Sequence, residues 1–207
     1  MKIASLAMAF LLTSAACAFA ADDDGFQSLF DGKSLKGWKV NENEKSFSVE
    51  DGAIKSNGER SHLFYVGADR PFKNFHFIAD VMTKKNSNAG IFIHTKFQDT
   101  GWPAQGYECQ VNNSYDKDPQ KTGGLYNTVR VTEAPAKDDV WFKYEIIVEG
   151  QHIQVLIDGK KVVDYQEPKD KAGPLKLSPE GGAIALQAHD PGSTVYFKNI
   201  KVKRLEK

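Results

Sequence analysis

The sequence contains almost no cysteine, and this absence excludes a disulfide-stabilised fold. Only Cys17 and Cys109 occur among the 207 residues. Cys17 falls in an N-terminal segment that we expect to be removed, so no internal disulfide can form in the mature chain. Cys109 stands between Tyr107 and Val111. In that setting a lone cysteine is expected to be a buried apolar filler rather than a reactive thiol.

A surplus of charge is also missing. The 27 Lys and Arg residues equal the 27 Asp and Glu residues in number. Binding to nucleic acid or to an anionic membrane surface needs an excess of basic residues, so we expect neither partner. No apolar run approaches the roughly 20 residues of a transmembrane helix, and we therefore expect no membrane span.

The N-terminus has the pattern of a secretory signal peptide. Met1-Lys2 is followed by the apolar run Ile3–Leu12 and then by Ala18-Phe19-Ala20. A basic end, a short apolar core and an A-x-A site predict cleavage after Ala20 and export of the protein. We expect a bacterial-type, periplasmic or extracellular protein with one domain, residues 21–207. Lipidation at Cys17 is the less favoured alternative, because the usual Leu three residues earlier is missing.

No segment after residue 21 has the 3.6-residue period of a long helix; short β-rich runs recur between turn signals instead. Asp51-Gly52, Gly150-Gln151 and Asp158-Gly159 separate pairs of runs, as in two-residue hairpins. We predict an all-β fold, a two-sheet antiparallel sandwich or jelly roll. The predicted strands are Phe47–Val49, Leu63–Val66, Phe75–Thr83, Ala89–Thr95, Tyr107–Asn112, Trp141–Val148, His152–Ile157, Val162–Tyr165, Ala183–Ala188 and Thr194–Val202.

Three predicted strands carry unusual polar faces. Strand alternation places Glu108, Gln110 and Asn112 on one face of their strand. The same argument pairs Gln187 with His189, and Phe92 with His94. These faces lack Lys and combine amides, imidazoles and one acid, which suits a groove that binds hydroxyl groups. A coincidence of unrelated strands is the competing interpretation, and the irregular segment 113–137 is a candidate binding loop.

An ordered set of motifs resembles one family. The motifs are Phe26-Gln-Ser-Leu-Phe-Asp-Gly-Lys-Ser-Leu-Lys-Gly-Trp38, Asn88-Ala-Gly-Ile-Phe92, Gly106-Tyr-Glu-Cys-Gln110, Thr122-Gly-Gly-Leu-Tyr126, Ile184-Ala-Leu-Gln-Ala-His189 and Val195-Tyr-Phe-Lys-Asn-Ile200. Together they resemble the 3-keto-disaccharide hydrolase domain family over residues 26–205. The resemblance implies a jelly roll of the concanavalin A-like lectin and glucanase type. It also implies cleavage of 3-keto-glycosides, with a keto-sugar as the carbohydrate partner.

The motif around Glu108 argues against ordinary glycosidase chemistry. Laminarinase-type glucanases carry E-x-D-x-x-E on one strand, whereas this chain has Glu-Cys-Gln-Val-Asn-Asn. Amides cannot replace the nucleophile and the proton donor of a retaining enzyme. Cleavage of a 3-keto sugar needs no nucleophilic carboxylate. Its ketone acidifies the hydrogen on C2, and the resulting enolate can expel the oxygen from C1. One base, a stabiliser of the enolate and one proton donor are enough.

The resemblance and this chemistry assign roles to eight residues. Glu108 and His189 are expected to share the acid–base work, in an order that stays open. The substrate-binding residues are expected to be Gln110, Gln187 and His94, with Asn112 on the same strand, and with Trp102 and Tyr126 as stacking platforms. A divalent cation held by Glu108 with His189 is an option, although no cofactor follows from the sequence.

Several alternatives remain open at this point. A hydrolase and a lyase outcome both fit an elimination. A non-catalytic carbohydrate-binding module would use the same groove and aromatic residues, and a structural domain of the cell envelope would use neither. His62 is expected to be an ordinary surface or groove-edge residue.

Overall fold

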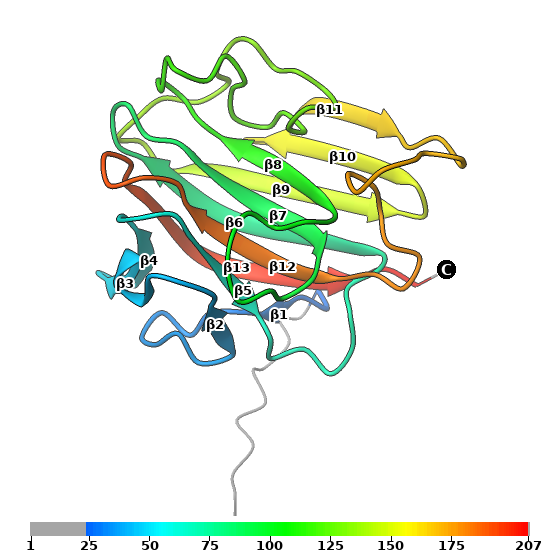
Figure 1. Ribbon diagram of the computed structural model, residues 1–207, viewed down its shortest axis with the longest axis horizontal. Helices are drawn as coiled ribbons and strands as arrows, with labels where there is room; N and C mark the ends of the chain where they lie inside the picture. Colours follow the sequence, from blue (N-terminus) through cyan, green and yellow to red (C-terminus); the bar gives the residue numbers. More distant parts are fainter. Residues whose placement is uncertain (1–23, 207) are drawn as a thin grey trace, which may run out of the picture.

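The computed structural model describes residues 24–206, and the predicted signal peptide at 1–20 lies outside them. Within the described range the fold consists of two antiparallel sheets packed face to face (Figure 1). The all-β sandwich predicted from the sequence is therefore confirmed. One short 3-10 helix, η1 (Glu44–Ser46), interrupts the strands. No helix within residues 24–206 is long and apolar enough to cross a membrane.

The larger sheet has the strand order β11-β10-β9-β6-β13-β4-β3, and β1 pairs with β13 beside this path. Its strands are β1 (Gln27–Ser28), β3 (Phe47–Glu50), β4 (Ala53–Ser56), β6 (Phe75–Thr83), β9 (Phe142–Glu149), β10 (His152–Ile157), β11 (Lys160–Gln166) and β13 (Val195–Arg204). The smaller sheet has the order β2-β5-β12-β7-β8. Its strands are β2 (Trp38–Val40), β5 (Ser61–Tyr65), β7 (Ala89–Thr95), β8 (Tyr107–Val111) and β12 (Ala183–Ala188).

The core lies between the sheets, and the strands of the larger sheet alternate buried and more exposed residues. On β9 the side chains of Phe142, Tyr144, Ile146 and Val148 are buried, whereas Lys143 and Glu149 are exposed. Cys109 is fully buried in the same core, as the sequence predicted. The smaller sheet differs from the larger one, because β5 and β7 are buried along their whole length. Its second face must therefore be covered by other parts of the chain.

Two hairpins have the turn geometry that their sequence predicted. Asp51 and Gly52, which join β3 to β4, have φ values of 49° and 75°. Asp158 and Gly159, which join β10 to β11, have φ values of 49° and 76°. Positive φ at both central residues is the mark of the tight turn that matches the twist of paired strands.

A bulge in β7 changes the direction of one predicted site residue. Ala185 pairs with Phe92, but Ala183 pairs with Thr95, so β7 contains one residue more than β12 over this stretch. His94 lies at this point with φ 51°. Because successive strand residues face opposite sides, the extra residue reverses the face of everything beyond it. His94 consequently does not share the face of Phe92.

The chain can approach the bulge closely only where it has glycine. Gly106 has φ 87°, and a Cβ atom there would lie 2.1 Å from the carbonyl oxygen of Ile93. Gly159 also has a positive φ, but a Cβ atom there would meet nothing within 4 Å. The two glycines thus separate the cost of backbone conformation from the cost of a steric clash.

We predict that Gly106→Ala destabilises the protein about twice as much as Gly159→Ala. The left-handed conformation costs about 1–2 kcal/mol for a non-glycine residue in both variants, and overpacking adds about 1–3 kcal/mol only at Gly106. Urea unfolding of both variants measures the difference. Equal losses of unfolding free energy would show that the chain at Gly106 relaxes freely.

Candidate active site

The outer face of the smaller sheet carries a cavity of about 290 Å³. The inner face belongs to the main core, whereas Phe64, Phe92 and Ala185 form a separate apolar cluster on the outer face. In Figure 1 the loop between β7 and β8 curves across this outer face. Six residues predicted for the site line the cavity together: Trp102, Glu108, Gln110, Tyr126, Gln187 and His189.

Glu108 reaches the cavity floor through a space left by Gly90. A Cβ atom at Gly90 would lie 2.5 Å from Oε1 of Glu108, so the glycine of the Asn-Ala-Gly-Ile-Phe motif makes room for this carboxyl. Nε2 of Gln187 donates a hydrogen bond to the same Oε1 at 3.1 Å. Burial raises the pKa of Glu108 to about 8; the hydrogen bond from Gln187 opposes this, and the charge of Asp118 adds to it. Glu108 is thus mainly protonated at neutral pH.

Two buried amide oxygens of residues that line the cavity have no hydrogen-bond partner among residues 24–206. Nε2 of Gln110 donates to Oδ1 of Asn88 at 2.6 Å, and Nε2 of Gln187 donates to Glu108. The Oε1 atoms of both glutamines are buried and accept no hydrogen bond from the described residues. A buried acceptor needs a donor from water or a ligand. These oxygens are therefore suited to accept hydrogen bonds from hydroxyl groups.

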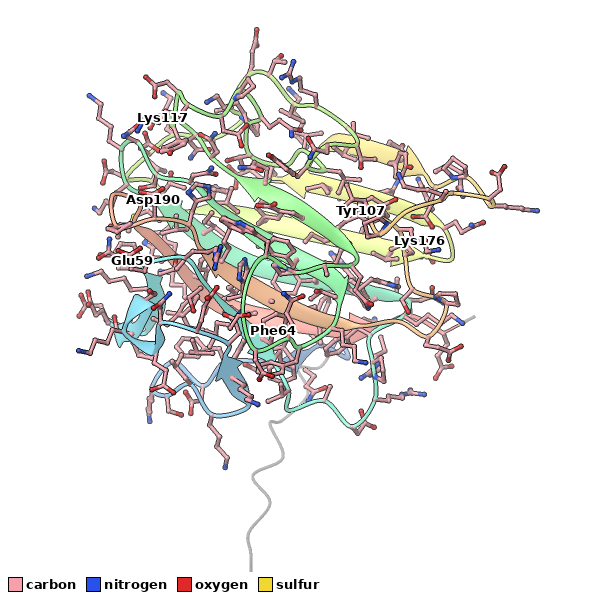
Figure 2. The ribbon with its side chains drawn as sticks, in the orientation of Figure 1. Glu59, Phe64, Tyr107, Lys117, Lys176 and Asp190 are labelled. Carbon is pink, nitrogen blue, oxygen red and sulfur yellow. The ribbon has the colours of Figure 1, made fainter. Side chains whose placement is uncertain are left out.

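His189 forms a hydrogen-bonded pair with its neighbour Asp190. Nδ1 of His189 lies 2.7 Å from Oδ2 of Asp190, which also accepts from Oγ of Ser193 at 2.9 Å, while its Oδ1 accepts from the backbone N–H of Gly192 at 2.8 Å. Burial favours a higher pKa for Asp190, but the hydrogen bonds from His189 and Ser193 outweigh it and lower the pKa. An ionised Asp190 orients the ring, so that Nε2 is the nitrogen of His189 that remains for chemistry. Figure 2 shows Asp190 and Lys117 at the same end of the molecule.

Two aromatic residues, Trp102 and Tyr126, form walls of the cavity, and their role as stacking platforms stays a prediction. The side chain of Trp102 is 46% exposed, and its ring lies 5.5 Å from that of His189. Tyr126 is fixed beside the acid because its backbone N–H donates to the carbonyl oxygen of Glu108 at 2.9 Å. The preceding Thr-Gly-Gly-Leu segment also pairs with β8, since Gly123 N–H donates to the carbonyl oxygen of Gln110 at 2.9 Å.

The structure does not place His94 and Asn112 in the cavity. Nε2 of His94 is 2.9 Å from the carbonyl oxygen of Lys73, and the bulge in β7 directs the ring there. Asn112 lies one residue beyond β8, and its amide nitrogen donates to the backbone oxygens of Tyr115, Asp118 and Gln120. The substrate-binding roles predicted for these two residues are therefore wrong: His94 binds backbone, and Asn112 organises the loop.

Sequence reasoning missed several residues of the site. Asn88 belongs to the Asn-Ala-Gly-Ile-Phe motif, which predicts no role for it. Asp118 and Asn127 lie in the predicted binding loop 113–137, but nothing in the sequence distinguishes them within it, and Gln105 comes from a loop without any signal. The sequence predicts His62 as an ordinary surface or groove-edge residue. It is fully buried on β5 beside Trp102 at the cavity, and neither ring nitrogen has a partner within the described residues. Burial lowers the pKa of His62 to about 3, so this ring is neutral at neutral pH.

A divalent cation at Glu108 and His189 stays a prediction. Both side chains line the cavity, but no group of three or more His, Cys, Asp or Glu side chains within residues 24–206 is arranged to hold a metal ion. Mg²⁺ commonly takes only one or two carboxylates and completes its shell with water and substrate oxygens. Glu108 would have to lose its proton to serve as such a ligand.

The chain is similar over most of its length to an enzyme of known name. It is 24% identical over 232 aligned residues to a 3-keto-disaccharide hydrolase of Bacteroides thetaiotaomicron, covering 89% of this chain and 80% of that protein. It also matches two crystal structures of candidate glycosyl hydrolases from Parabacteroides distasonis. The first has 26% identity and a TM-score of 0.74 and covers 88% of this chain and 95% of the other; the second has 24% identity and a TM-score of 0.67 and covers 87% and 99%.

A carbohydrate-binding module of Bacillus subtilis shares the fold alone, with a TM-score of 0.58 and 14% identity over 81% of this chain and 95% of the module. The decisive match is to the profile of one domain family, which covers residues 25–203. That range includes every motif on which the resemblance was based and every residue that lines the cavity. The chain belongs to the family of 3-keto-alpha-glucoside-1,2-lyase-like domains.

Proposed function

We propose that the protein cleaves the glycosidic bond of 3-keto-glycosides, including 3-keto-disaccharides, by elimination between C1 and C2. One observation carries the proposal: a single buried carboxyl with a pKa of about 8 shares a cavity with a histidine that is oriented by an aspartate. The names of the family and of the Bacteroides relative support this substrate class.

His189 is the proposed base. Its Nε2 takes the proton from C2, and the electrons of the C2–H bond form an enolate with the ketone at C3. Asp190 holds the Nδ1–H of His189, so it orients the ring and stabilises the imidazolium that forms. The amide groups of Asn88 and Asn127 line the cavity and are suited to stabilise the enolate oxygen.

Glu108 is the proposed acid. Its pKa of about 8 keeps it protonated at neutral pH, and it gives this proton to the glycosidic oxygen as the C1–O bond breaks. The enolate electrons form the C1=C2 double bond, and the product is a 1,2-unsaturated 3-keto sugar. His189 has gained one proton and Glu108 has lost one, so exchange with solvent restores both. Release of this product is the lyase outcome; addition of water across C1=C2 is the hydrolase outcome.

The remaining polar and aromatic groups are suited to hold the sugar. The unpartnered Oε1 atoms of Gln110 and Gln187 accept hydrogen bonds from hydroxyl groups. Trp102 and Tyr126 offer ring faces on which the C–H face of a sugar ring packs. Export through the predicted signal peptide would place this site where it meets glycosides outside the cytoplasm.

A second carboxylate gives a competing function some support. Asp118 lines the same cavity as Glu108 and acts on its pKa. An ordinary glycosidase uses two carboxyl groups that flank the scissile glycosidic bond, and it would cleave unoxidised glycosides. The elimination is favoured because the His189–Asp190 pair has no role in that mechanism.

The first prediction concerns the substrate. The protein should consume a 3-keto-disaccharide and leave the unoxidised disaccharide intact, which chromatography of both reactions will show. Glu108→Gln should lower kcat/KM by about 10²–10⁴-fold, because it removes the proton donor. Glu149→Gln, at an exposed acid on β9, is the matched control. Saturable binding of unoxidised sugars without turnover of either would instead establish a binding module.

The second prediction concerns pH. If Glu108 is the acid, kcat/KM should fall about tenfold per pH unit above pH 8, because the donor loses its proton there. The Glu108→Gln variant should lack this alkaline limb, since its residual activity does not depend on that proton. A rise of kcat/KM through pH 8 would reverse the assignment and make Glu108 the base.

The third prediction concerns the His189–Asp190 pair. His189→Gln should lower kcat by about 10²–10⁴-fold, and Asp190→Asn should cause a smaller loss, because it misorients the ring without removing it. Asp164→Asn breaks a comparable contact with His152 on the larger sheet and should leave kcat unchanged. A fully active His189→Gln variant with native stability would remove this residue from the mechanism.

A further inference from the structure

The loop between β7 and β8 presents Trp102 at the mouth of the cavity, and a side chain of the loop itself holds its tip together. Nε2 of Gln98 donates to the carbonyl oxygens of Thr100 at 2.7 Å and Trp102 at 2.9 Å. Its Oε1 accepts from the backbone N–H of Ala104 at 2.8 Å. The amide group of Gln98 thus takes the place of backbone pairing and gives the tip a defined shape.

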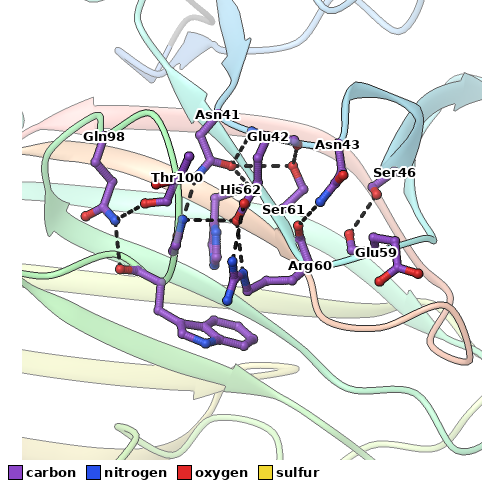
Figure 3. A network of polar contacts seen from close by, with 12 residues as sticks. Asn41, Glu42, Asn43, Ser46, Glu59, Arg60, Ser61, His62, Gln98 and Thr100 are labelled. Atoms are coloured by element: carbon purple, nitrogen blue, oxygen red, sulfur yellow. Dashed lines mark hydrogen bonds and ion pairs between the residues drawn. The ribbon is translucent and has the colours of Figure 1, made fainter.

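An ion pair outside the cavity holds this tip against the sheet. Arg60 binds Glu42 through both carboxylate oxygens, with Nε–Oε1 at 2.9 Å and Nη2–Oε2 at 3.3 Å (Figure 3). Oε1 of Glu42 also accepts from the backbone N–H of Gly101 at 3.1 Å. The amide of Asn41 donates to the carbonyl oxygen of Gly101 at 3.4 Å. Both backbone groups of the residue before Trp102 are therefore bound by the segment that follows β2.

The tryptophan ring packs against three neighbours. The guanidinium carbon of Arg60 lies 5.4 Å from the ring centroid of Trp102, within cation–π range. The buried ring of His62 meets Trp102 edge-on at 5.5 Å, and that of His189 lies 5.5 Å away on the cavity side. Arg60 therefore contacts the platform from one side, while its partner Glu42 fixes the backbone.

We propose that Glu42 and Arg60 are positioning residues that fix Trp102 as the platform for the second ring of the substrate, the one that departs. This inference rests on the proposed function, because it assigns the keto-sugar ring of the substrate to the cavity floor and the departing sugar ring to the cavity mouth. Glu108 lies on the cavity floor over Gly90, where the keto ring must react. Trp102 is 46% exposed at the mouth, where the departing ring would emerge.

The pair is not expected to matter much for stability. The side chains of Arg60 and Glu42 are 42% and 17% exposed, and such partly exposed pairs contribute about 0–1 kcal/mol. A positioning role and a merely structural role therefore predict different results. If the pair only anchors the loop, its loss should affect all substrates alike.

The test compares a 3-keto-disaccharide with the methyl 3-keto-glucoside, which lacks the second ring. In Glu42→Ala and Arg60→Ala, kcat/KM for the disaccharide should fall about 3–10-fold through KM, as expected for the loss of one aromatic contact. The value for the methyl glycoside should change less than twofold. The measured quantity is the ratio of kcat/KM for the disaccharide to kcat/KM for the methyl glycoside. Trp102→Ala should lower this ratio too, and Glu42→Ala should have no further effect on it in the Trp102→Ala background.

The matched control is Glu50→Ala, which breaks the Lys55–Glu50 ion pair on the larger sheet and should leave the ratio unchanged. Thermal unfolding will show that the variants remain folded. An unchanged ratio in both Glu42→Ala and Arg60→Ala, or an equal loss for both substrates, would overturn the inference. If the wild-type protein turns over neither substrate, the proposed function fails, and calorimetric binding of an unoxidised disaccharide and of methyl glucoside to the same variants tests the positioning role separately.

Discussion

The smaller sheet has to serve two environments at once, and the rest of the structure depends on this constraint. The inner face of the sheet packs in the core, and the outer faces of β7, β8 and β12 contribute residues to the cavity floor. Side chains alternate along a strand with a period of two. Because Tyr107 and Cys109 point into the core, Glu108 and Gln110 must point to the outer face of the sheet. The packing of the sandwich therefore sets the side to which the carboxyl and the amide point, and Gly90, Gln187 and Asn88 then fix where they lie.

Alternation is also what made much of the site predictable from the sequence. Glu108, Gln110 and Gln187 lie on strands, His189 directly follows β12 and keeps its direction, and all four line the cavity. The rule fails wherever the strand is irregular. The extra residue of β7 turns His94 toward backbone carbonyls, and Asn112 follows the last residue of β8 into a loop. Neither the bulge in β7 nor the end of β8 before Asn112 can be recognised from the pattern of apolar residues.

Residues from loops could not be predicted for a different reason. Asp118 reaches the cavity from an irregular segment, and the position of such a segment is set by tertiary hydrogen bonds rather than by local preference. The burial of His62 depends in the same way on Trp102, which comes from a distant loop and packs against it. Tyr126 could be predicted because it ends a family motif, and Trp102 because it is an aromatic residue in a loop. The residues that hold Trp102 in place, Glu42 and Arg60, could not be predicted.

The pairing of Thr122–Tyr126 with β8 has a consequence beyond the position of Tyr126. β8 is the edge strand of the smaller sheet, and its backbone groups bond to this segment rather than remaining open. An open strand edge invites pairing with another molecule, and the segment that carries a wall of the cavity closes this edge of the smaller sheet. A change in this segment that altered substrate choice would at the same time put the solubility of the protein at risk, and this link limits how freely the segment can vary.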